Sequence, residues 1–320
     1  MKIKLRYIDT MSKNYTNEVL WKLITQWYDI DEDSEPDYII DGGMGSEFTK
    51  FPNAVRIQII GENIAPDFNA FDYAIGFDHM QFGDRYIRVP LYVFYDAYQN
   101  MLSITKSLNK EELCKRKFCS FVVSNSRYAD PKRDEFFKKL CEYKKVDSAG
   151  RHLNNMGGSF LEDKLAFVAQ YKFNIAFENC SSDGYTTEKI MEPMSVNSLP
   201  IYWGNPNVEI DFNKDSFINL SSFKTVEDCI EYIKLLDNDD DLYYQTLQQP
   251  WFRVNNAVDY NSELKSFFDN IFYNRTKEKR INMYGRQSVL YNNLDKFYIQ
   301  HDPKNTLKYK ISEIIKKFKS

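Results

Sequence analysis

The chain has 320 residues, 43% of them hydrophobic and 28% charged, and a formal net charge of −4 at pH 7. It is long enough to bury roughly three quarters of its unfolded surface in one large domain or two smaller ones. The negative net charge gives no electrostatic reason to expect nucleic acid as a partner. No apolar run approaches the 18 or so residues of a membrane-spanning helix.

The first third of the chain predicts strands joined by a helix and polar connections. Residues 3–7 alternate apolar and polar side chains and predict a strand, and a sequence that begins in this way predicts no secretory signal. Apolar residues of 19–27 share one helical face, and residues 37–40 and 55–60 predict two further strands. Glu62 follows the last of these strands, and a carboxylate at the end of a buried strand is well placed to act as a base.

A polar, helix-compatible stretch at residues 98–115 precedes a regular alternation of predicted strands and helices. Between residues 118 and 203 the order is strand, helix, strand, helix, strand, helix, strand. This order predicts a parallel sheet covered by helices on both faces. One of the helices is expected to begin near Pro131, because proline is favoured in the first turn of a helix.

Residues 171–204 contain the pattern most typical of a ligand site. An apolar strand ends at Glu178 and Asn179, a polar loop follows, and Thr186 is predicted to cap a helix with Lys189 in its first turn. The N-terminus of a helix attracts anions through unpaired N–H groups and the helix dipole. Because ligands of open α/β sheets bind at the carboxyl ends of strands, we expect a phosphate-bearing ligand here.

Three segments of this stretch, YKFNIAFEN, GYTTEKI and LPIYWG, resemble the nucleotide-sugar-binding core of the α-1,3/4-fucosyltransferases, glycosyltransferase family 10. The chain departs from the family pattern at Thr186, where an apolar residue is usual, while Thr187, Glu188 and Lys189 remain. The resemblance extends over about residues 56–95 and 118–244, which is most of the chain.

The resemblance implies an α/β fold with two Rossmann-like domains facing a cleft, the glycosyltransferase B architecture, followed by a helical C-terminal tail. We expect an acceptor-binding α/β domain at residues 1–115 and a GDP-fucose-binding α/β domain at residues 116–255. Residues 256–320 are expected to form C-terminal helices and a basic amphipathic tail.

The same resemblance implies the site residues. Glu62, in the segment GENIAPDFNAFDYAIGFD, matches the proposed catalytic base of the family; the structural alternative is a carboxylate that caps a turn or pairs with Arg85 or Arg88. The residues implied to bind the donor are Asn125, Arg151, Asn179, Tyr185, Glu188 and Lys189.

Two of these donor residues are cations. Arg151, in VDSAGR, and Lys189 are implied to stabilise the departing diphosphate, since a guanidinium can bind two phosphate oxygens at once. Glu188 is implied to hold ribose or fucose hydroxyls. Arg133 matches a position near the nucleotide less closely, and a salt bridge along its own helix is the alternative. Each residue alone also has a structural explanation, but their joint occurrence at the family spacing favours the functional one.

The expected reaction is an inverting transfer of L-fucose from GDP-β-L-fucose to the 3-OH of N-acetylglucosamine in N-acetyllactosamine-type glycans, which gives a Lewis x-type product. The alternatives are another nucleotide-sugar-dependent glycosyltransferase of the same architecture, or a non-catalytic nucleotide- or carbohydrate-binding protein. No cofactor is expected to be required, and a divalent metal is expected at most to stimulate. The acidic runs at residues 31–33 and 237–241 are typical of solvated turns, and the three histidines share no metal-ligand spacing.

Residues 304–320 contain six lysines, with apolar residues at helical spacing. Such a helix either lies on an anionic membrane surface or docks on its own domain, and both alternatives are open. The five cysteines show no paired short spacing and indicate reduced thiols. We therefore expect a cytoplasmic protein of the bacterial kind, with peripheral contact at the inner membrane as the alternative. The oligomeric state is left open.

Overall fold

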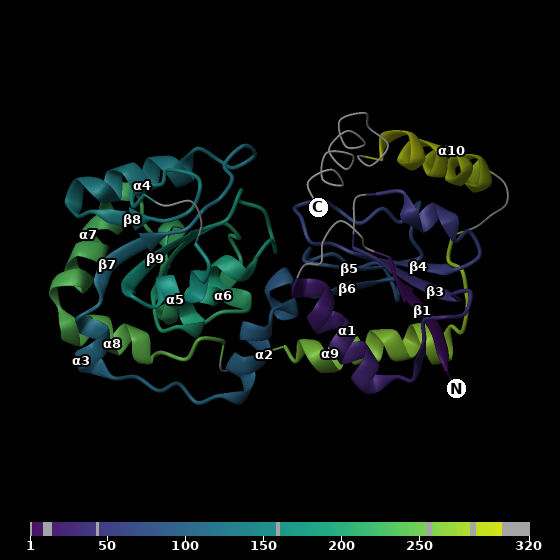
Figure 1. Cartoon of the computed structure of the whole chain (residues 1–320), viewed down its shortest axis with the longest axis horizontal. Coiled ribbons are helices and arrows are strands. Elements are labelled where there is room, and N and C mark those ends of the chain that lie inside the picture. The colour runs from purple at the N-terminus through teal and green to yellow at the C-terminus, as the bar shows by residue number, and fades with distance from the viewer. Residues whose placement is uncertain are drawn as a thin grey trace, which may run out of the picture. The chain divides into compact units, whose positions relative to one another are not determined.

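The structure is a computed structural model that describes residues 2–8, 15–42, 45–157, 161–253, 258–281 and 286–302. The chain forms two compact units (Figure 1). Unit 1 consists of Met1–Val89 and Asp259–Ser320, and unit 2 consists of Pro90–Val258. The predicted basic tail at residues 304–320 lies outside the described residues.

Unit 1 contains, among its described residues, a six-stranded parallel sheet in the order β2-β1-β3-β4-β5-β6. The strands are β1 (Ile3–Tyr7), β2 (Ile30–Asp31), β3 (Tyr38–Asp41), β4 (Val55–Ile59), β5 (Tyr73–Gly76) and β6 (Tyr86–Arg88). The helices are α1 (Tyr15–Trp27), the 3-10 helix η1 (Glu47–Lys50), α9 (Tyr260–Asp269), the π-helix η6 (Asn270–Asn274) and α10 (Arg286–His301). Figure 1 shows α1 and α9 below this sheet and α10 above it.

Unit 2 contains, in its described part, a five-stranded parallel sheet in the order β11-β10-β9-β7-β8. The strands are β7 (Lys117–Phe121), β8 (Val146–Ser148), β9 (Tyr171–Phe177), β10 (Leu199–Trp203) and β11 (Ile218–Asn219). The α-helices are α2 (Asp96–Ser103), α3 (Lys110–Cys114), α4 (Lys132–Tyr143), α5 (Lys164–Val168), α6 (Glu188–Ser195), α7 (Val226–Asn238) and α8 (Asp240–Gln248). Short 3-10 helices are η2 (Leu91–Phe94), η3 (Val208–Ile210), η4 (Lys214–Ser216) and η5 (Leu220–Ser222).

The strand period of two assigns the two faces of the unit 2 sheet. Phe173, Ile175 and Phe177 of β9 belong to the large apolar core that also contains residues of α4, α7 and α8. The side chains between them point to the opposite face, against which α6 packs. Figure 1 likewise shows α5 and α6 on the other side of these strands from α4 and α7. Glu178, the next residue after β9, continues the pattern towards α6.

Two parallel α/β units and a helical C-terminal segment confirm the predicted fold class. The strands expected at residues 3–7, 37–40 and 55–60 are β1, β3 and β4, whereas β5 and β6 were not predicted. All five cysteines are free thiols. Within the described ranges, no helix combines the length and the apolar character needed to cross a membrane.

Candidate functional site

The carboxyl ends of the unit 2 strands meet at one edge of the sheet, because all of these strands are parallel. The segments that follow β7, β8, β9 and β10 contain Asn125, Arg151, Asn179 and Asn205, respectively. In open α/β sheets this edge is the usual ligand site. Four polar residues that follow these strands therefore lie along this edge, and the first three are among the residues predicted from the sequence to bind the donor.

A buried carboxylate lies at the centre of this edge. Glu178 is 0% exposed, and its Oε1 accepts a hydrogen bond from the backbone N of Thr187 at 2.8 Å. Its Oε2 accepts from Thr187 Oγ1 at 2.7 Å and from Lys189 Nζ at 3.2 Å. Burial raises the pKa of Glu178, although the charge of Lys189 opposes that rise. Three donors thus compensate the desolvation of this carboxyl group.

Lys189 also contacts a second carboxylate. Its Nζ lies 3.5 Å from Glu188 Oε1, and the hydroxyl of Tyr95 donates to Glu188 Oε2 at 3.2 Å. Burial by itself would raise the pKa of Glu188, but the charges of Lys189 and Lys164 outweigh it and lower that pKa to about 2. Burial by itself would lower the pKa of Lys189, but the charges of Glu188 and Glu178 raise that pKa well above its usual value. Glu188 and Lys189 are therefore an ion pair at neutral pH.

The start of α6 differs by one residue from the predicted cap. Thr187, not Thr186, is the N-cap, and its hydroxyl accepts from the backbone N of Lys189 at 3.4 Å. Thr186 Oγ1 instead accepts from Asn205 Nδ2 at 2.9 Å, while Asn205 Oδ1 accepts from the backbone N of Gly184 at 2.9 Å. The side chain of Asn205 therefore holds the loop before α6 against the end of β10.

The end of β10 requires a residue without a side chain. A Cβ atom added to Gly204 would lie 2.4 Å from Cγ of Glu178 and 2.9 Å from the hydroxyl of Tyr202, and the backbone there has φ +159°. This close approach gives a physical reason for the small residue that ends the LPIYWG segment.

Arg133 joins two of the loops at the edge. Its side chain is buried, with Nη1 donating to Asn179 Oδ1 at 3.1 Å and Nη2 to the backbone O of Asn125 at 3.0 Å. The arginine thus connects the loops after β7 and β9, and it does not form the alternative salt bridge along its own helix. The side chain of Asn125 is exposed and accepts from the backbone N of Arg127 at 2.9 Å.

Arg151 lies in the turn after β8 and is exposed. The turn packs closely against the segment after β7, because a Cβ on Gly150 would lie 2.0 Å from the carbonyl O of Val123. Among the residues that the structure describes, none pairs with the Arg151 guanidinium. Tyr185 is only 3% exposed, and it is one of the groups that raise the pKa of Lys189.

Glu62 belongs to unit 1 and is exposed, in the segment after β4. The alternative ion pairs with Arg85 and Arg88 are not formed. Arg85 Nε donates to the carbonyl of Asp72 at 2.7 Å, and Arg88 Nε donates to the carbonyl of Phe77 at 3.1 Å. Glu62 has no side-chain partner among the described residues and is accessible from solvent.

Four residues of the site, Tyr95, Glu178, Thr187 and Asn205, were not among the site residues predicted from the sequence. Glu178 and Thr187 lie within the motif and could have been selected from it. Tyr95 is 93 residues from its partner Glu188, so no sequence spacing connects them. Within the described part of the chain, no group of three or more His, Cys, Asp or Glu residues could hold a metal ion.

Two family models match the chain. The model of the α-(1,3)-fucosyltransferase FucT N-terminal domain matches residues 5–95. The C-terminal model of glycosyltransferase family 10 (fucosyltransferase) matches residues 113–292, which include every residue of the unit 2 site described above except Tyr95.

Individual relatives agree with these matches. The chain is 33% identical to the α-(1,3)-fucosyltransferase FucT of Helicobacter pylori over 280 residues, 75% of this chain and 58% of that protein. It is 32% identical to GDP-fucose protein O-fucosyltransferase 3 of Xenopus laevis over 187 residues, 54% of this chain and 40% of the relative. The chain spans about half the length of the curated relatives it matches.

The fold has counterparts among crystal structures. An α1,3-fucosyltransferase with GDP-fucose matches with a TM-score of 0.71 at 30% identity, over 89% of this chain and 93% of that chain. An α1,3-fucosyltransferase with GDP matches with a TM-score of 0.70, also at 30% identity, over 84% of this chain and 89% of the other.

Proposed function

We propose that this chain, which belongs to glycosyltransferase family 10 (the fucosyltransferases), transfers L-fucose from GDP-β-L-fucose to a hydroxyl group of a glycan. The observation that carries the proposal is the cluster of Glu178, Thr187, Glu188 and Lys189 at the carboxyl edge of the unit 2 sheet. The similarity to an α1,3-fucosyltransferase with GDP-fucose supports this choice of donor.

The donor site is assigned to unit 2. Arg151 is exposed and pairs with no described residue, so its guanidinium is available for the diphosphate. Lys189 adds positive charge from the first turn of α6. Glu188 is an acceptor for ribose or fucose hydroxyls, Asn179 and Tyr185 shape the pocket, and Asn125 lies beside the nucleotide. Arg133 holds the loops that carry Asn125 and Asn179.

The reaction is a single displacement with inversion at the anomeric carbon. Glu62 accepts the proton of the acceptor hydroxyl, the 3-OH of N-acetylglucosamine in an N-acetyllactosamine-type glycan. The acceptor oxygen forms a bond to fucose C1 as the bond from C1 to the β-phosphate oxygen breaks, and GDP departs with that electron pair. A positioned base contributes about a hundredfold to ten-thousandfold in rate, and cations at the leaving group add an electrostatic contribution.

Glu62 is tested by replacing it with Gln and measuring both transfer and GDP binding. Glu62→Gln keeps the size of the side chain but removes its basicity, so kcat should fall at least about a hundredfold. The affinity for GDP should stay unchanged, because the nucleotide is assigned to unit 2. Full transfer by this variant, or a loss of GDP binding, would refute the role of Glu62.

Donor and acceptor class are tested together. The protein is incubated with GDP-fucose, other nucleotide sugars, N-acetyllactosamine and an unmodified folded protein as acceptors. Transfer of fucose to the 3-OH of the glycan, identified by linkage analysis of a Lewis x-type product, supports the proposal. Transfer of another sugar selects a different glycosyltransferase, and binding without turnover selects a non-catalytic protein. The protein acceptor is included because relatives named GDP-fucose protein O-fucosyltransferase 3 match this chain.

We further propose that transfer requires no metal ion, because fixed cations and a helix N-terminus meet the charge of the leaving group. Activity should then persist after dialysis against EDTA.

Peripheral membrane contact through residues 304–320 is also proposed. It predicts that the protein co-sediments with anionic vesicles and that removal of these residues abolishes the co-sedimentation.

A further inference from the structure

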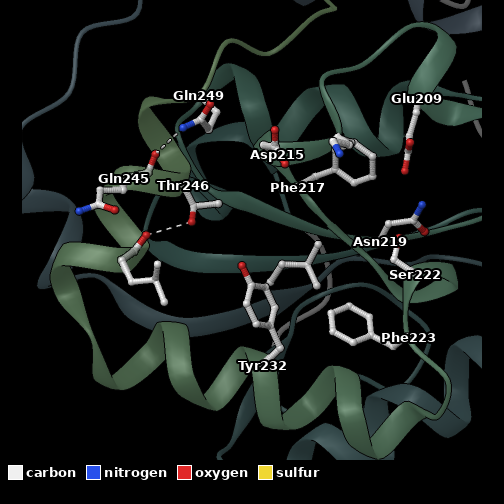
Figure 2. Close-up of a pocket in the computed structure, with 13 residues that line it drawn as sticks. Glu209, Asp215, Phe217, Asn219, Ser222, Phe223, Tyr232, Gln245, Thr246 and Gln249 are labelled. Atoms are coloured by element: carbon white, nitrogen blue, oxygen red, sulfur yellow. Dashed lines mark hydrogen bonds between the residues drawn. The ribbon is translucent and has the colours of Figure 1, made fainter.

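Two hollows lie along the β11 edge of the unit 2 sheet, and Figure 2 shows the first of them. Their volumes are about 480 Å³ and 540 Å³. Both are lined by Glu209, Lys214, Asn219 and Ser222, so they adjoin each other. Together they form what we call the edge groove, and its volume is in the range of ligand sites.

The side chains of the edge groove combine aromatic faces with neutral hydrogen-bonding groups. Phe223 and Tyr232 pack together with ring centroids 5.6 Å apart and an interplanar angle of 39°. Amide and hydroxyl side chains occupy the opposite side, as Figure 2 shows for Gln245, Thr246 and Gln249. Aromatic rings with such groups around them suit a ligand that has both apolar C–H faces and many hydroxyls.

The formal charges of the groove cancel. Glu209 and Asp215 are balanced by Lys214 and Arg253. A groove with this balance has no electrostatic preference for phosphate groups or for a polycation. The ligand that fits is polar and uncharged.

Hydrogen-bonding capacity is left over in the first hollow. Among the described residues, none hydrogen-bonds to the hydroxyl of Tyr232, which points into the hollow below Asp215 in Figure 2. Burial and the charge of Asp215 raise the pKa of Tyr232, so this hydroxyl keeps its proton at neutral pH. The exposed side-chain amide of Gln245 is likewise without a partner in the described part of the chain.

The edge groove also adjoins the loop that carries the donor-site residues. Asn207 lines the second hollow, and its Nδ2 donates to Asp183 in the loop before α6. The backbone N of Asn207 donates to Asn205 Oδ1 at 2.9 Å, the same atom that accepts from Gly184. A chain-like ligand in the groove would therefore extend from the carboxyl edge of the sheet along β11.

We propose that the edge groove binds an uncharged oligosaccharide, namely the part of a glycan acceptor remote from the sugar that receives fucose. This inference rests on the proposed function, which supplies a glycan as the acceptor. Tyr232 and Phe223 pack against sugar rings, and Gln245, Asn219 and Glu209 bind ring hydroxyls. The groove thereby selects long acceptors over short ones.

The experiment compares acceptor lengths in matched variants of the full chain. Gln245→Ala and Tyr232→Ala alter the groove, whereas Gln248→Ala alters an exposed glutamine of the same helix that does not line it. The acceptors are N-acetyllactosamine and a hexasaccharide of three such repeats. Gln245→Ala and Tyr232→Ala should raise KM for the hexasaccharide by about threefold to tenfold, the size of one hydrogen bond or a little more. KM for the disaccharide, KM for GDP-fucose and kcat should not change, and Gln248→Ala should change nothing.

A hexasaccharide KM unchanged by Gln245→Ala, or a disaccharide KM that rises equally, overturns the inference. Gln245 is exposed, so its variant stays informative even if Tyr232→Ala fails to fold. A titration of the hexasaccharide into protein saturated with GDP, followed by NMR or calorimetry, separates this inference from the proposed function. If no glycan is fucosylated, the proposed function fails, and the titration still decides whether the groove binds the oligosaccharide. Binding that is weakened by Gln245→Ala supports the groove, and binding equal in all variants refutes it.

Discussion

The ammonium group of Lys189 lies between two carboxylates, those of Glu178 and Glu188. Much of its charge is therefore compensated within the protein before any diphosphate binds. In the proposed function, Lys189 alone would not offset the charge of GDP, and we propose Arg151, which pairs with no described residue, as the second cation. We therefore propose that Lys189 mainly positions the two glutamates, while Arg151 binds the phosphates.

Tyr95 is the positioning residue for Glu188. Tyr95→Phe removes the hydroxyl that donates to Glu188 Oε2 but keeps the ring. A hydrogen bond to a charged group contributes about 1.5 to 3 kcal/mol, so kcat/KM for GDP-fucose should fall by about tenfold or more. Steady-state kinetics at varied donor concentration measure this effect.

The same substitution at the half-exposed Tyr273 of unit 1 is the control, because Tyr273 is given no part in the proposed donor site. Tyr273→Phe should leave kcat/KM unchanged. An equal loss in both variants would show that the effect of Tyr95→Phe is not specific to Glu188.

At the scale of the element, the start of α6 is stabilised by one hydroxyl with three hydrogen bonds. Thr187 Oγ1 donates to Glu178 Oε2 and accepts from the backbone N and from Nζ of Lys189. Thr187→Val keeps the shape, removes the N-cap and leaves a buried carboxyl oxygen with one donor fewer. Loss of a cap costs about 1 kcal/mol and loss of one hydrogen bond to a buried carboxylate about 1.5 to 3 kcal/mol, so the free energy of unfolding should fall by about 3 kcal/mol.

Thr187→Ser restores the hydroxyl and is the matched variant. Its free energy of unfolding should be less than about 1 kcal/mol below that of the wild type, since the substitution removes one methyl group. Urea unfolding followed by tryptophan fluorescence measures both. If valine were tolerated as well as serine, the hydroxyl would not stabilise this helix start.

The end of β10 gives a second prediction for an element. Gly204→Ala places a Cβ 2.4 Å from Glu178 Cγ, so backbone or the buried glutamate must move. Gly83→Ala is the control, because Gly83 also has positive φ (+56°) but nothing lies within 4 Å of its Cβ position. The control should cost about 1 to 2 kcal/mol for the backbone alone.

Gly204→Ala should cost more than that, by about 1 to 3 kcal/mol for overpacking. It should also weaken GDP binding, because Glu178 holds Lys189. Chemical unfolding and calorimetric titration with GDP test the two parts, and equal stability of both alanine variants would contradict the packing argument.

The strands and helices that have strong periodicity were predictable from the sequence, and those without it were not. The apolar run before Glu178 and the helix after Pro131 are β9 and α4. The strand β5 (Tyr73–Gly76) is buried on both faces like β9, but with four residues it offers neither an alternation nor an apolar run as long as that of β9. The cap was misplaced by one residue because Thr186 and Thr187 are both good caps, and they are distinguished by tertiary contacts with Asn205 and Glu178, respectively.

At the scale of the whole molecule, the motif indicated candidate site residues, but not what they contact. Glu188 and Lys189 were expected from the family spacing, and the structure places them side by side with Glu178. Tyr95 and Arg133 reach the site from other elements through tertiary packing, which no local pattern encodes. A site in this fold is assembled from the ends of several strands, so its contacts cannot be predicted from one segment.

The acids of the site give the whole fold a pH dependence of stability with two opposite signs. The pKa of Glu188 is about 2 in the folded protein, below its ordinary value near 4.5. Its contribution to stability is therefore complete above pH 4.5 and is lost as the pH falls towards 2. At pH 7 that contribution is at most about 3 kcal/mol, from 1.36 kcal/mol per pKa unit. Glu188→Gln should thus be less stable than the wild type at pH 7, and the difference should shrink between pH 4.5 and pH 2.

Glu178 provides the opposite case within the same cluster. Burial raises the pKa of Glu178, so the favourable contribution from its titration is present below pH 4.5 and is lost as the pH rises through the folded-state pKa. Relative to the wild type, Glu178→Gln should therefore become more stable as the pH rises above 4.5, whereas Glu188→Gln becomes less stable as the pH rises from 2 towards 4.5. Urea unfolding at a series of pH values from 2 to 7 measures both differences. Parallel slopes for the two variants would mean that the two carboxyl groups do not differ in their folded-state pKa, and the assignment of Glu188 as the permanent anion of the site would be wrong.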